Sequence, residues 1–277
     1  MEAILAIWKR DIVKFFRDKA QLIGSLALPF LLLIVFGGGM GGAIKSMMSG
    51  ANAAGPVKDF NFVQFMFPGI IAMTVFNTAI ISALSVVQDR EFGYLREMLV
   101  SPVPRSSVAL GKVLGGSSIA VIQGLLILLF IPLVGVKLNL AMIIKLIPAM
   151  FIVAFTVSSL GLFVASFIKT SQGFHVAIQL LIFPMLFLSG ALFPLNGLPA
   201  WMDFLIKINP MTYAVDMFKK IILEVNTMDP MLKQAMGLNL QIFNHSITML
   251  VEVVIILVIG LIFTSLATAS FNKAKAN

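Results

Sequence analysis

Long apolar runs separated by short polar segments dominate the chain. Most of the runs reach or exceed the roughly 20 residues that cross a bilayer as a helix. This pattern predicts an all-α integral membrane protein with six transmembrane helices. The expected spans are about Gln21–Met40, Phe65–Val87, Val108–Val134, Ala141–Ile168, Phe174–Leu192 and Ser246–Phe271.

Residues 1–20, before the first apolar run, have two faces at helical spacing. One is basic and the other apolar, which predicts an interfacial amphipathic helix with its basic side chains toward lipid headgroups. A cleavable signal peptide is the alternative, but Leu22–Phe36 has no convincing small-residue cleavage site, so we expect the segment to be retained. The two faces hold Lys9, Arg10, Lys14, Arg17 and Lys19, and Leu5, Trp8, Ile12, Phe15 and Phe16.

A charged island, Gln88–Lys112, separates the second and third spans. Phe92, Leu95 and Leu99 recur at helical spacing while the charged residues fall elsewhere, which predicts a short amphipathic helix at the water interface. Pro102 and Pro104 should end it near Val100 or Ser101. Such a helix is suited to being pushed by a partner.

The segment 193–244, between the fifth and sixth spans, is apolar but too interrupted by proline to cross the membrane. We expect short re-entrant helices on the outer side, anchored at headgroup level by Trp201 and Tyr213. Asn209–Pro210 is a turn signal, so one helix should end there and a second begin near Met211. The interrupting prolines are Pro194, Pro199 and Pro210.

Composition supports the membrane assignment and excludes several kinds of chemistry. The chain is 59% apolar, with a mean hydropathy of +1.02, and contains no Cys, which excludes disulfides and thiolate chemistry. The net charge of +8 comes from basic residues near spans, where anionic lipid explains it better than nucleic acid does. The G-x-x-x-x-G-K-[ST] phosphate-binding motif is absent, so we expect no ATP binding by the chain itself.

The distribution of Lys and Arg predicts that both termini are cytoplasmic. Twelve lie in the segments expected inside, whereas Lys45, Lys58, Lys137 and Lys145 are expected in short outer loops. Four more, Lys207, Lys219, Lys220 and Lys233, are expected in the long outer segment, where the rule is weaker. Those expected inside are Lys9, Arg10, Lys14, Arg17, Lys19, Arg90, Arg96, Arg105, Lys112, Lys169, Lys273 and Lys275.

A few polar residues interrupt the spans. Glu252, about two turns into the last span, could face a substrate path or receive a cation, or could simply reach the interface or a neighbouring helix. Asn77 and Gln179 are further candidates for the path, although such amides often only join helices. Gly111 and Gly115 lie four residues apart and let one face of the third span approach a neighbour closely.

Two stretches resemble a known family. DREFGYLREMLVSPVPR followed by LGK, residues 89–112, resembles the first cytoplasmic loop of ABC-2 type exporter permeases, especially the daunorubicin-resistance-like branch. LSGALFPLNGLPAWMDFLIKINPMTYAVDMFKK, residues 188–220, is similar to the outer segment of the same family. The resemblance covers nearly the whole chain and implies one transmembrane domain, 1–277: an interfacial helix (1–20), spans one to five (21–192), the re-entrant outer segment (193–244) and span six (246–271).

The resemblance implies a role for each stretch. The first would be the coupling helix that docks into an ATP-binding subunit, and the second an outer gate or a static plug. The coupling residues would be Asp89, Arg90, Glu91, Phe92, Gly93, Leu95, Arg96, Glu97, Pro102 and Arg105, with Gly93 allowing close approach. The outer residues would be Pro194, Trp201, Asn209, Pro210 and Tyr213.

The function implied is that of a permease subunit, not an enzyme, in a prokaryotic cell membrane. It would export hydrophobic or amphipathic compounds, with two ATP-binding subunits that hold ATP and Mg, a second permease copy or paralogue, and membrane lipids as partners. A lipid-linked glycan or polysaccharide is the alternative cargo. An ion-coupled secondary carrier and a membrane-embedded lipid-modifying enzyme are alternatives of other classes.

Overall fold

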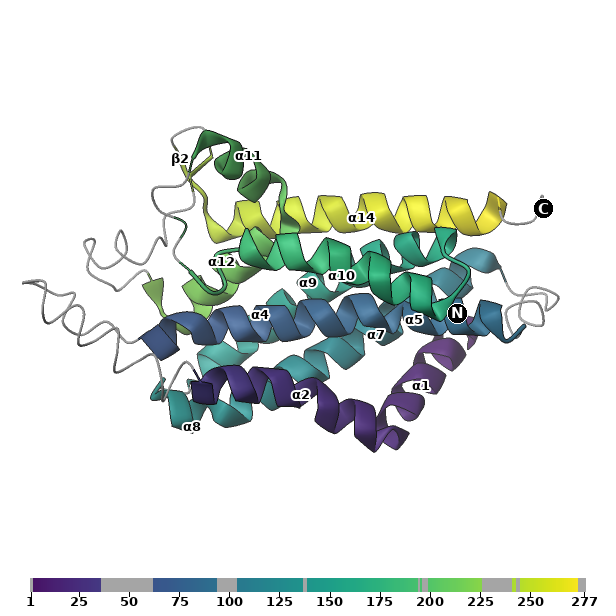
Figure 1. Ribbon diagram of the computed structural model, residues 1–277, viewed down its shortest axis with the longest axis horizontal. Helices are drawn as coiled ribbons and strands as arrows, with labels where there is room; N and C mark the ends of the chain where they lie inside the picture. The colour runs from purple at the N-terminus through teal and green to yellow at the C-terminus, as the bar shows by residue number, and fades with distance from the viewer. Residues whose placement is uncertain are drawn as a thin grey trace, which may run out of the picture.

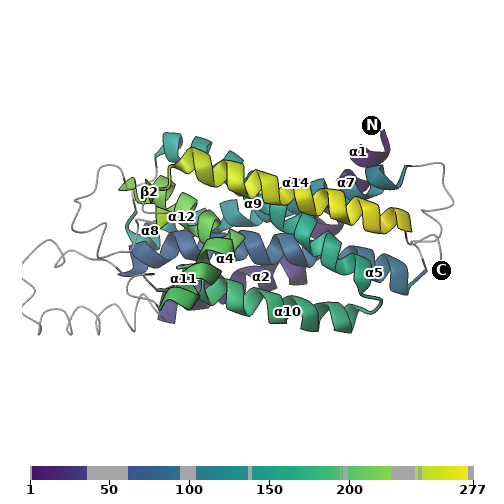
Figure 2. The ribbon, with the colours of Figure 1, turned by 90° about the horizontal axis from the view of Figure 1, so that it is seen from above.

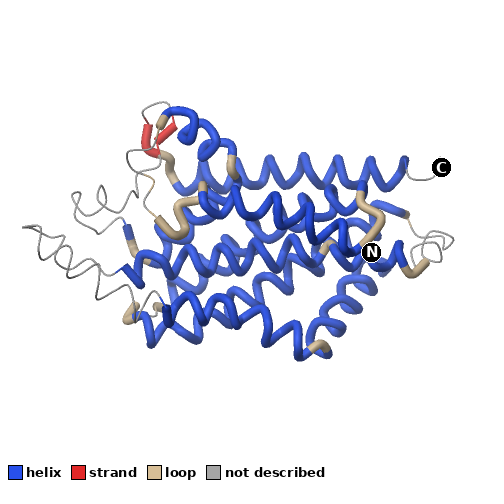
Figure 3. The backbone as a smooth tube through the Cα atoms, in the orientation of Figure 1, coloured by secondary structure: helices blue, strands red, loops and turns tan. Residues whose placement is uncertain are grey.

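The computed structural model describes residues 2–35, 62–93, 104–136, 139–193, 195, 199–225, 241–242 and 245–273. These residues are helical apart from connections and one pair of two-residue strands, β1 (Gln241–Ile242) and β2 (His245–Ser246) (Figures 1 and 3). The expected all-helical class is therefore confirmed.

Among the described residues, four helices are long and apolar enough to cross a membrane: Phe62–Glu91, Arg105–Phe130, Leu140–Phe167 and Met249–Ser270. The first consists of α4 (Phe62–Ser82) and α5 (Leu84–Glu91), and the second of α7 (Arg105–Ile127) and the 3-10 turn η3 (Leu128–Phe130), which α8 (Ile131–Val134) follows. The others are α9 (Leu140–Phe167) and α14 (Met249–Lys273). Figures 1 and 2 show them running side by side along the long axis of the molecule.

Two shorter apolar helices accompany the four. The first lies in α2 (Lys19–Ile34), which follows α1 (Glu2–Arg17), and the second is α10 (Ser171–Phe187). The lengths and composition thus establish a multi-pass helical membrane protein, while the expected six spans remain a proposal.

The centre of the bundle is α4. Its Phe65, Phe67 and Phe76 side chains are fully buried, and α4 packs against α7, α9 and α12. The outer helix faces are apolar as well, since Leu180 and Leu250 are largely exposed. A bundle that is apolar both inside and outside is expected where lipid is the solvent.

The outer segment forms α11 (Ala200–Ile208) and α12 (Pro210–Ile222), joined at Asn209. The Asn209 side chain accepts a hydrogen bond from the Met211 N–H (3.0 Å), so it caps α12, and Pro210 occupies the first helical turn. The predicted break between two short helices is confirmed. α12 packs against α4, α9 and α14, whereas α11 contacts mainly α12.

The structure differs from the sequence prediction in the charged island. Asp89, Arg90 and Glu91 form the last turn of α5, which continues span two, and do not begin a separate helix. Phe92 caps this helix and Gly93 has a φ of +85°, so the helix of span two ends at Glu91. Leu95, Arg96, Glu97 and Pro102 lie outside the described residues, as does Pro194 of the outer segment.

Candidate coupling site

The N-terminal helix α1 is docked along the start of α7. A Cβ added to Gly111 would lie 3.0 Å from Ile7 Cβ, and one added to Gly115 would lie 3.3 Å from Asp11 Cβ. Trp8 Nε1 donates a hydrogen bond to Ser118 Oγ (3.0 Å). The small-residue face of the third span therefore admits α1 at close range, so α1 is held against the bundle in addition to being amphipathic.

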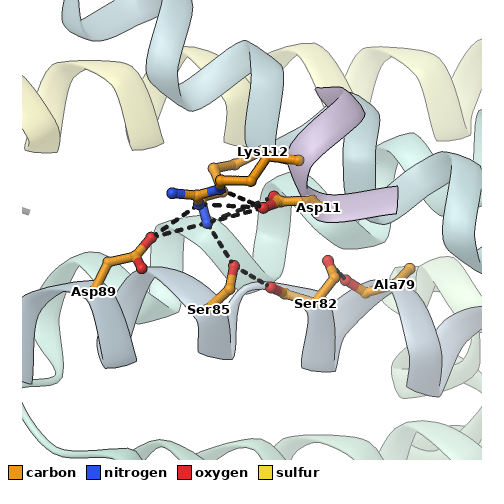
Figure 4. Close-up of polar contacts among 7 residues, drawn as sticks. Asp11, Ala79, Ser82, Ser85, Asp89 and Lys112 are labelled. Carbon is orange, nitrogen blue, oxygen red and sulfur yellow. Dashed lines mark hydrogen bonds and ion pairs between the residues drawn. The ribbon is translucent and has the colours of Figure 1, made fainter. Parts of the chain in front are cut away.

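A buried ion cluster joins α1, α5 and α7 (Figure 4). Lys112, with 4% of its side chain exposed, places Nζ 2.9 Å from Asp89 Oδ2 and 3.5 Å from the Asp11 carboxylate, and donates to Ser85 Oγ (2.9 Å). Arg10 Nη2 lies 3.1 Å from Asp11 Oδ1 and 3.2 Å from Asp89 Oδ2. Two cations thus face two carboxylates, which is the arrangement that makes buried charge tolerable.

The guanidinium of Arg10 stays charged in this setting. Partial burial lowers its pKa, but the carboxylates of Asp11 and Asp89 outweigh that effect and raise the pKa above its ordinary value. The cluster therefore keeps its cation on α1, which ties the N-terminal helix electrostatically to the end of α5.

Arg90, the next residue of α5, binds the C-terminal end of α9. Its Nη1 donates to the carbonyl oxygens of Ala165 (3.3 Å), Ser166 (3.3 Å) and Ile168 (2.8 Å). The last carbonyls of a helix lack intrahelical partners and carry partial negative charge, so a guanidinium there satisfies both requirements.

Glu91, the following residue, binds the N-terminus of α10. Its Oε2 accepts hydrogen bonds from Ser171 N (3.1 Å) and Ser171 Oγ (2.5 Å). Unpaired N–H groups and partial positive charge at a helix N-terminus favour a carboxylate in this position.

Three successive residues of α5 therefore bind three different parts of the bundle. Asp89 holds α1 and α7, Arg90 holds α9, and Glu91 holds α10. A displacement of the last turn of α5 would act on all of these helices at once. The chain leaves this turn through Phe92, 69% exposed, and Gly93.

The remaining described residues of the predicted coupling set are Gly93 and Arg105. A Cβ added to Gly93 would meet nothing within 4 Å, so its positive φ explains the glycine within this chain, and close approach to a partner remains a prediction. Arg105 begins α7 immediately after Pro104, its N-cap residue.

The outer residues divide between a buried and an exposed group. Asn209 is buried and donates through Nδ2 to Met185 O (2.7 Å), and the buried Tyr213 donates through its hydroxyl to Lys207 O (2.5 Å). Trp201, on α11, is 63% exposed. The exposed indole suits a headgroup anchor, whereas Tyr213 belongs to the packed part of the segment.

Glu252 belongs to a second buried charge cluster, between α12 and α14. Lys220 Nζ lies 2.5 Å from Glu252 Oε1 and 2.8 Å from Asp216 Oδ2, and Glu252 has no exposed surface. Lys219 donates to Gly190 O (2.7 Å), and its Nζ lies 3.6 Å from the ring centroid of Phe65. Burial lowers the pKa of Lys219 to about 7, while Asp216 acts in the opposite direction. These contacts fix α12 to α14, to α4 and to the turn that follows α10.

The other two candidates for a substrate path lie elsewhere. Asn77 is half-buried on α4 and Gln179 is exposed on α10. Among the described residues, no hydrogen bond or ion pair joins either of them to Glu252, so the structure does not bring the three together.

Several residues of these clusters were not singled out from the sequence. Lys112, counted as cytoplasmic, begins an apolar run, and a charge inside a span should have marked it. Lys219 and Lys220 were counted with the outer segment. They too are charges in an apolar stretch, and Asp216 four residues before Lys220 was an available partner. Asp11 gave none, because a lone acidic residue on an amphipathic helix is ordinary.

Comparison with known proteins identifies the family. The family model described as ABC-2 type transporter matches residues 2–223. A putative transport permease ycf38 from Porphyra purpurea is 30% identical over 78% of this chain and 72% of its own length. The inner membrane transport permease YadH of Escherichia coli K12 is 28% identical over 81% of this chain and 84% of its own.

A further relative is described as a drug transporter. The probable multidrug ABC transporter permease YbhR of Escherichia coli K12 is 29% identical over 62% of this chain, which spans 47% of the relative's length. The relatives and the family model together establish that the chain belongs to the ABC-2 type transporter family and is a membrane transport permease of an ABC system.

Proposed function

We propose that this permease is the membrane-spanning subunit of an ATP-driven exporter that moves hydrophobic or amphipathic compounds out of the cytoplasm or the inner leaflet. Separate ATPase subunits, two per transporter, supply the energy and hold ATP and Mg. A second copy of the permease, or a paralogue, completes the pathway in a prokaryotic cell membrane, with both termini in the cytoplasm.

The observation that carries the proposal is the last turn of α5. Asp89, Arg90 and Glu91 connect it to α1 and α7, to α9 and to α10. The chain continues from this turn into the segment that resembles the coupling helix. A push on that segment by an ATPase subunit is therefore delivered to several helices together, as alternating access requires.

The outer segment has unequal mobility in this proposal. Lys219, Lys220 and Glu252 fix α12 to the bundle, whereas α11 contacts mainly α12 and exposes Trp201 and Phe204. α11 is therefore the part suited to move as a gate, hinged at Asn209. A static plug that shields the exit is the alternative, and cross-linking α11 to a partner copy separates them, because only a gate loses transport when it is fixed.

The multidrug description of YbhR supports a drug-like cargo, and a lipid-linked glycan or polysaccharide is the alternative. The direct test is to purify the tagged chain from its native membrane, identify co-purifying proteins, and assay uptake of fluorescent hydrophobic compounds into inverted vesicles. We expect an ATPase subunit in the complex and uptake that requires ATP. Uptake driven by an ion gradient without ATP would support a secondary carrier and contradict the proposal.

A further inference from the structure

A cavity of about 400 Å³ lies between α1 and the bundle, beside the coupling site. One wall is α1, with Asp11 and Phe15, together with Asp18, which follows this helix. The other walls are α4 and α5, with Thr78, Ser82 and Ser85, and α7, with Ile119. A pocket of this size accommodates the polar head and the first carbons of an amphipathic molecule.

Three hydroxyl side chains of the cavity, Thr78, Ser82 and Ser85, form a stripe along span two that continues beyond the cavity to Asp89. The intervals of four, three and four residues place all four side chains on one helical face. Figure 4 shows Ser82, Ser85 and Asp89 on the same side of this helix, with Ser85 and Asp89 in contact with Lys112. A polar stripe inside a membrane span that borders a cavity marks a path for a polar group.

The hydroxyl groups of this stripe already donate hydrogen bonds within the protein. Ser82 Oγ donates to Ala79 O (2.6 Å), Ser85 Oγ donates to Ser82 O (2.9 Å), and Thr78 Oγ1 donates to Gln123 Oε1 (2.6 Å). Ser85 Oγ also accepts from Lys112 Nζ (2.9 Å), but a hydroxyl oxygen has two lone pairs, so each of the three keeps at least one that can accept a hydrogen bond. This wall therefore offers acceptors, and it favours a molecule that brings donors.

The charges on the walls favour the same kind of molecule. The carboxylates of Asp11 and Asp18 line the cavity with one ammonium, that of Lys14. Lys112 and Arg10 balance Asp11 and Asp89, so the surroundings are close to neutral and do not repel a cation. An anionic head would find donors at Lys14 and at the Gln88 amide, but it would also face the carboxylates of Asp11 and Asp18.

The location of the cavity indicates from where a ligand would enter it. The cavity lies under the amphipathic helix and beside the cytoplasmic end of span two, which is the expected depth of the inner-leaflet headgroups. Phe15, Ile81, Leu84 and Ile119 supply apolar wall for a hydrocarbon body.

We infer that this cavity binds the protonated amine head of a single-chain amphiphile that enters from the inner leaflet. The role of the cavity as an intake site for exported compounds rests on the proposed function. It narrows the proposed substrate class to amphiphiles with N–H donors. Binding itself requires neither ATP nor transport.

Binding can be followed through Trp8, which contacts α7 from α1. The chain has two tryptophans, so W201F leaves Trp8 as the sole indole. The full chain, with any ATPase subunit that co-purifies, is placed in phosphatidylcholine nanodiscs without nucleotide and titrated with dodecylammonium. Dodecyltrimethylammonium, which has the same charge but no N–H donor, and dodecyl sulfate are titrated in parallel.

We expect a saturable change in Trp8 emission with dodecylammonium, binding at least about five-fold weaker for dodecyltrimethylammonium, and no saturable change with dodecyl sulfate. S82A should weaken the binding of dodecylammonium about five-fold, because one hydrogen-bond acceptor is lost. S265A is the matched control, since Ser265 also donates to a backbone carbonyl of its own helix, Leu261 O (2.8 Å), but lies on the exposed side of α14.

Equal binding of the two cations, or an S82A variant that binds dodecylammonium as the parent does, would overturn the inference. If dodecylammonium did not bind as expected while ATP-driven uptake was intact, the proposed function would still stand. Binding as expected without any ATP-dependent uptake would instead contradict the proposed function and leave the site in place.

Discussion

Lys220 is the residue whose loss should destabilise the outer segment most. It lies within ion-pair distance of both Asp216 and Glu252, and Glu252 is fully buried. Removing one partner of a buried ion pair leaves the other charge uncompensated, which costs about 3 kcal/mol or more. Lys220→Met should therefore lower the thermal unfolding temperature of the purified protein clearly.

Two further variants make this prediction specific. Glu252→Gln added to Lys220→Met should restore part of the stability, because without Lys220 two carboxyl groups face each other, whereas an amide can donate a hydrogen bond to Asp216. Lys207→Met is the matched control: its pair with Asp203 (2.6 Å) is exposed and worth at most about 1 kcal/mol. Equal unfolding temperatures for Lys220→Met and Lys207→Met would show that the buried cluster does not hold α12.

Substitutions at Gly93 distinguish two reasons for a glycine at this position: its backbone conformation and the close approach of an ATPase subunit. Its φ of +85° demands a residue that tolerates the left-handed region, and asparagine does so far better than valine. Because an added Cβ meets open space within the chain, Gly93→Asn should keep most of the transport per ATP hydrolysed, and Gly93→Val should lose it. Loss in both variants would instead favour close approach of the ATPase subunit.

At the scale of elements, the docking of α1 on α7 depends on two glycines. Leucine at Gly111 would meet Ile7 and the Ile4 carbonyl, whose oxygen lies 3.2 Å from an added Cβ, and should lift α1 away. The measurement is trypsin cleavage within α1, at the bonds after Lys9, Arg10 or Lys14. Gly111→Leu should accelerate cleavage several-fold.

Gly24 provides the control for this measurement, because an added Cβ there meets nothing within 4 Å. Gly24→Leu should leave the cleavage rate unchanged. If both variants were cleaved at the parent rate, α1 would not depend on close contact with Gly111.

The element boundaries were largely predictable, and the contacts between elements were not. Apolar runs and prolines indicated the long helices and the break at Asn209, because both signals are local. The ending of the helix at Glu91 was missed, since Phe92, Leu95 and Leu99 still fit helical spacing across Gly93. The partners of Asp89, Arg90 and Glu91 lie 75 or more residues away in most cases, and no local pattern encodes such pairing.

At the scale of the whole molecule, the first prediction concerns sidedness. Ser106, at the start of α7, should face the cytoplasm, and Leu140, at the start of α9, should face outside. The chain has no Cys, so in single Ser106→Cys and Leu140→Cys variants an impermeant thiol reagent can label only the introduced cysteine. Labelling of only Leu140→Cys in intact cells is the expected result, and the reverse would invert the topology.

The central claim is that the last turn of α5 transmits work between the ATPase subunit and the spans. The most direct measurement is transport per ATP hydrolysed in vesicles that contain Arg90→Gln, with Arg17→Gln as an exposed arginine control. Arg90→Gln removes the guanidinium that holds the Ala165, Ser166 and Ile168 carbonyls. We expect the complex to assemble and hydrolyse ATP while transport falls at least about ten-fold, with Arg17→Gln unaffected. Transport at the parent rate in assembled Arg90→Gln complexes would contradict the account.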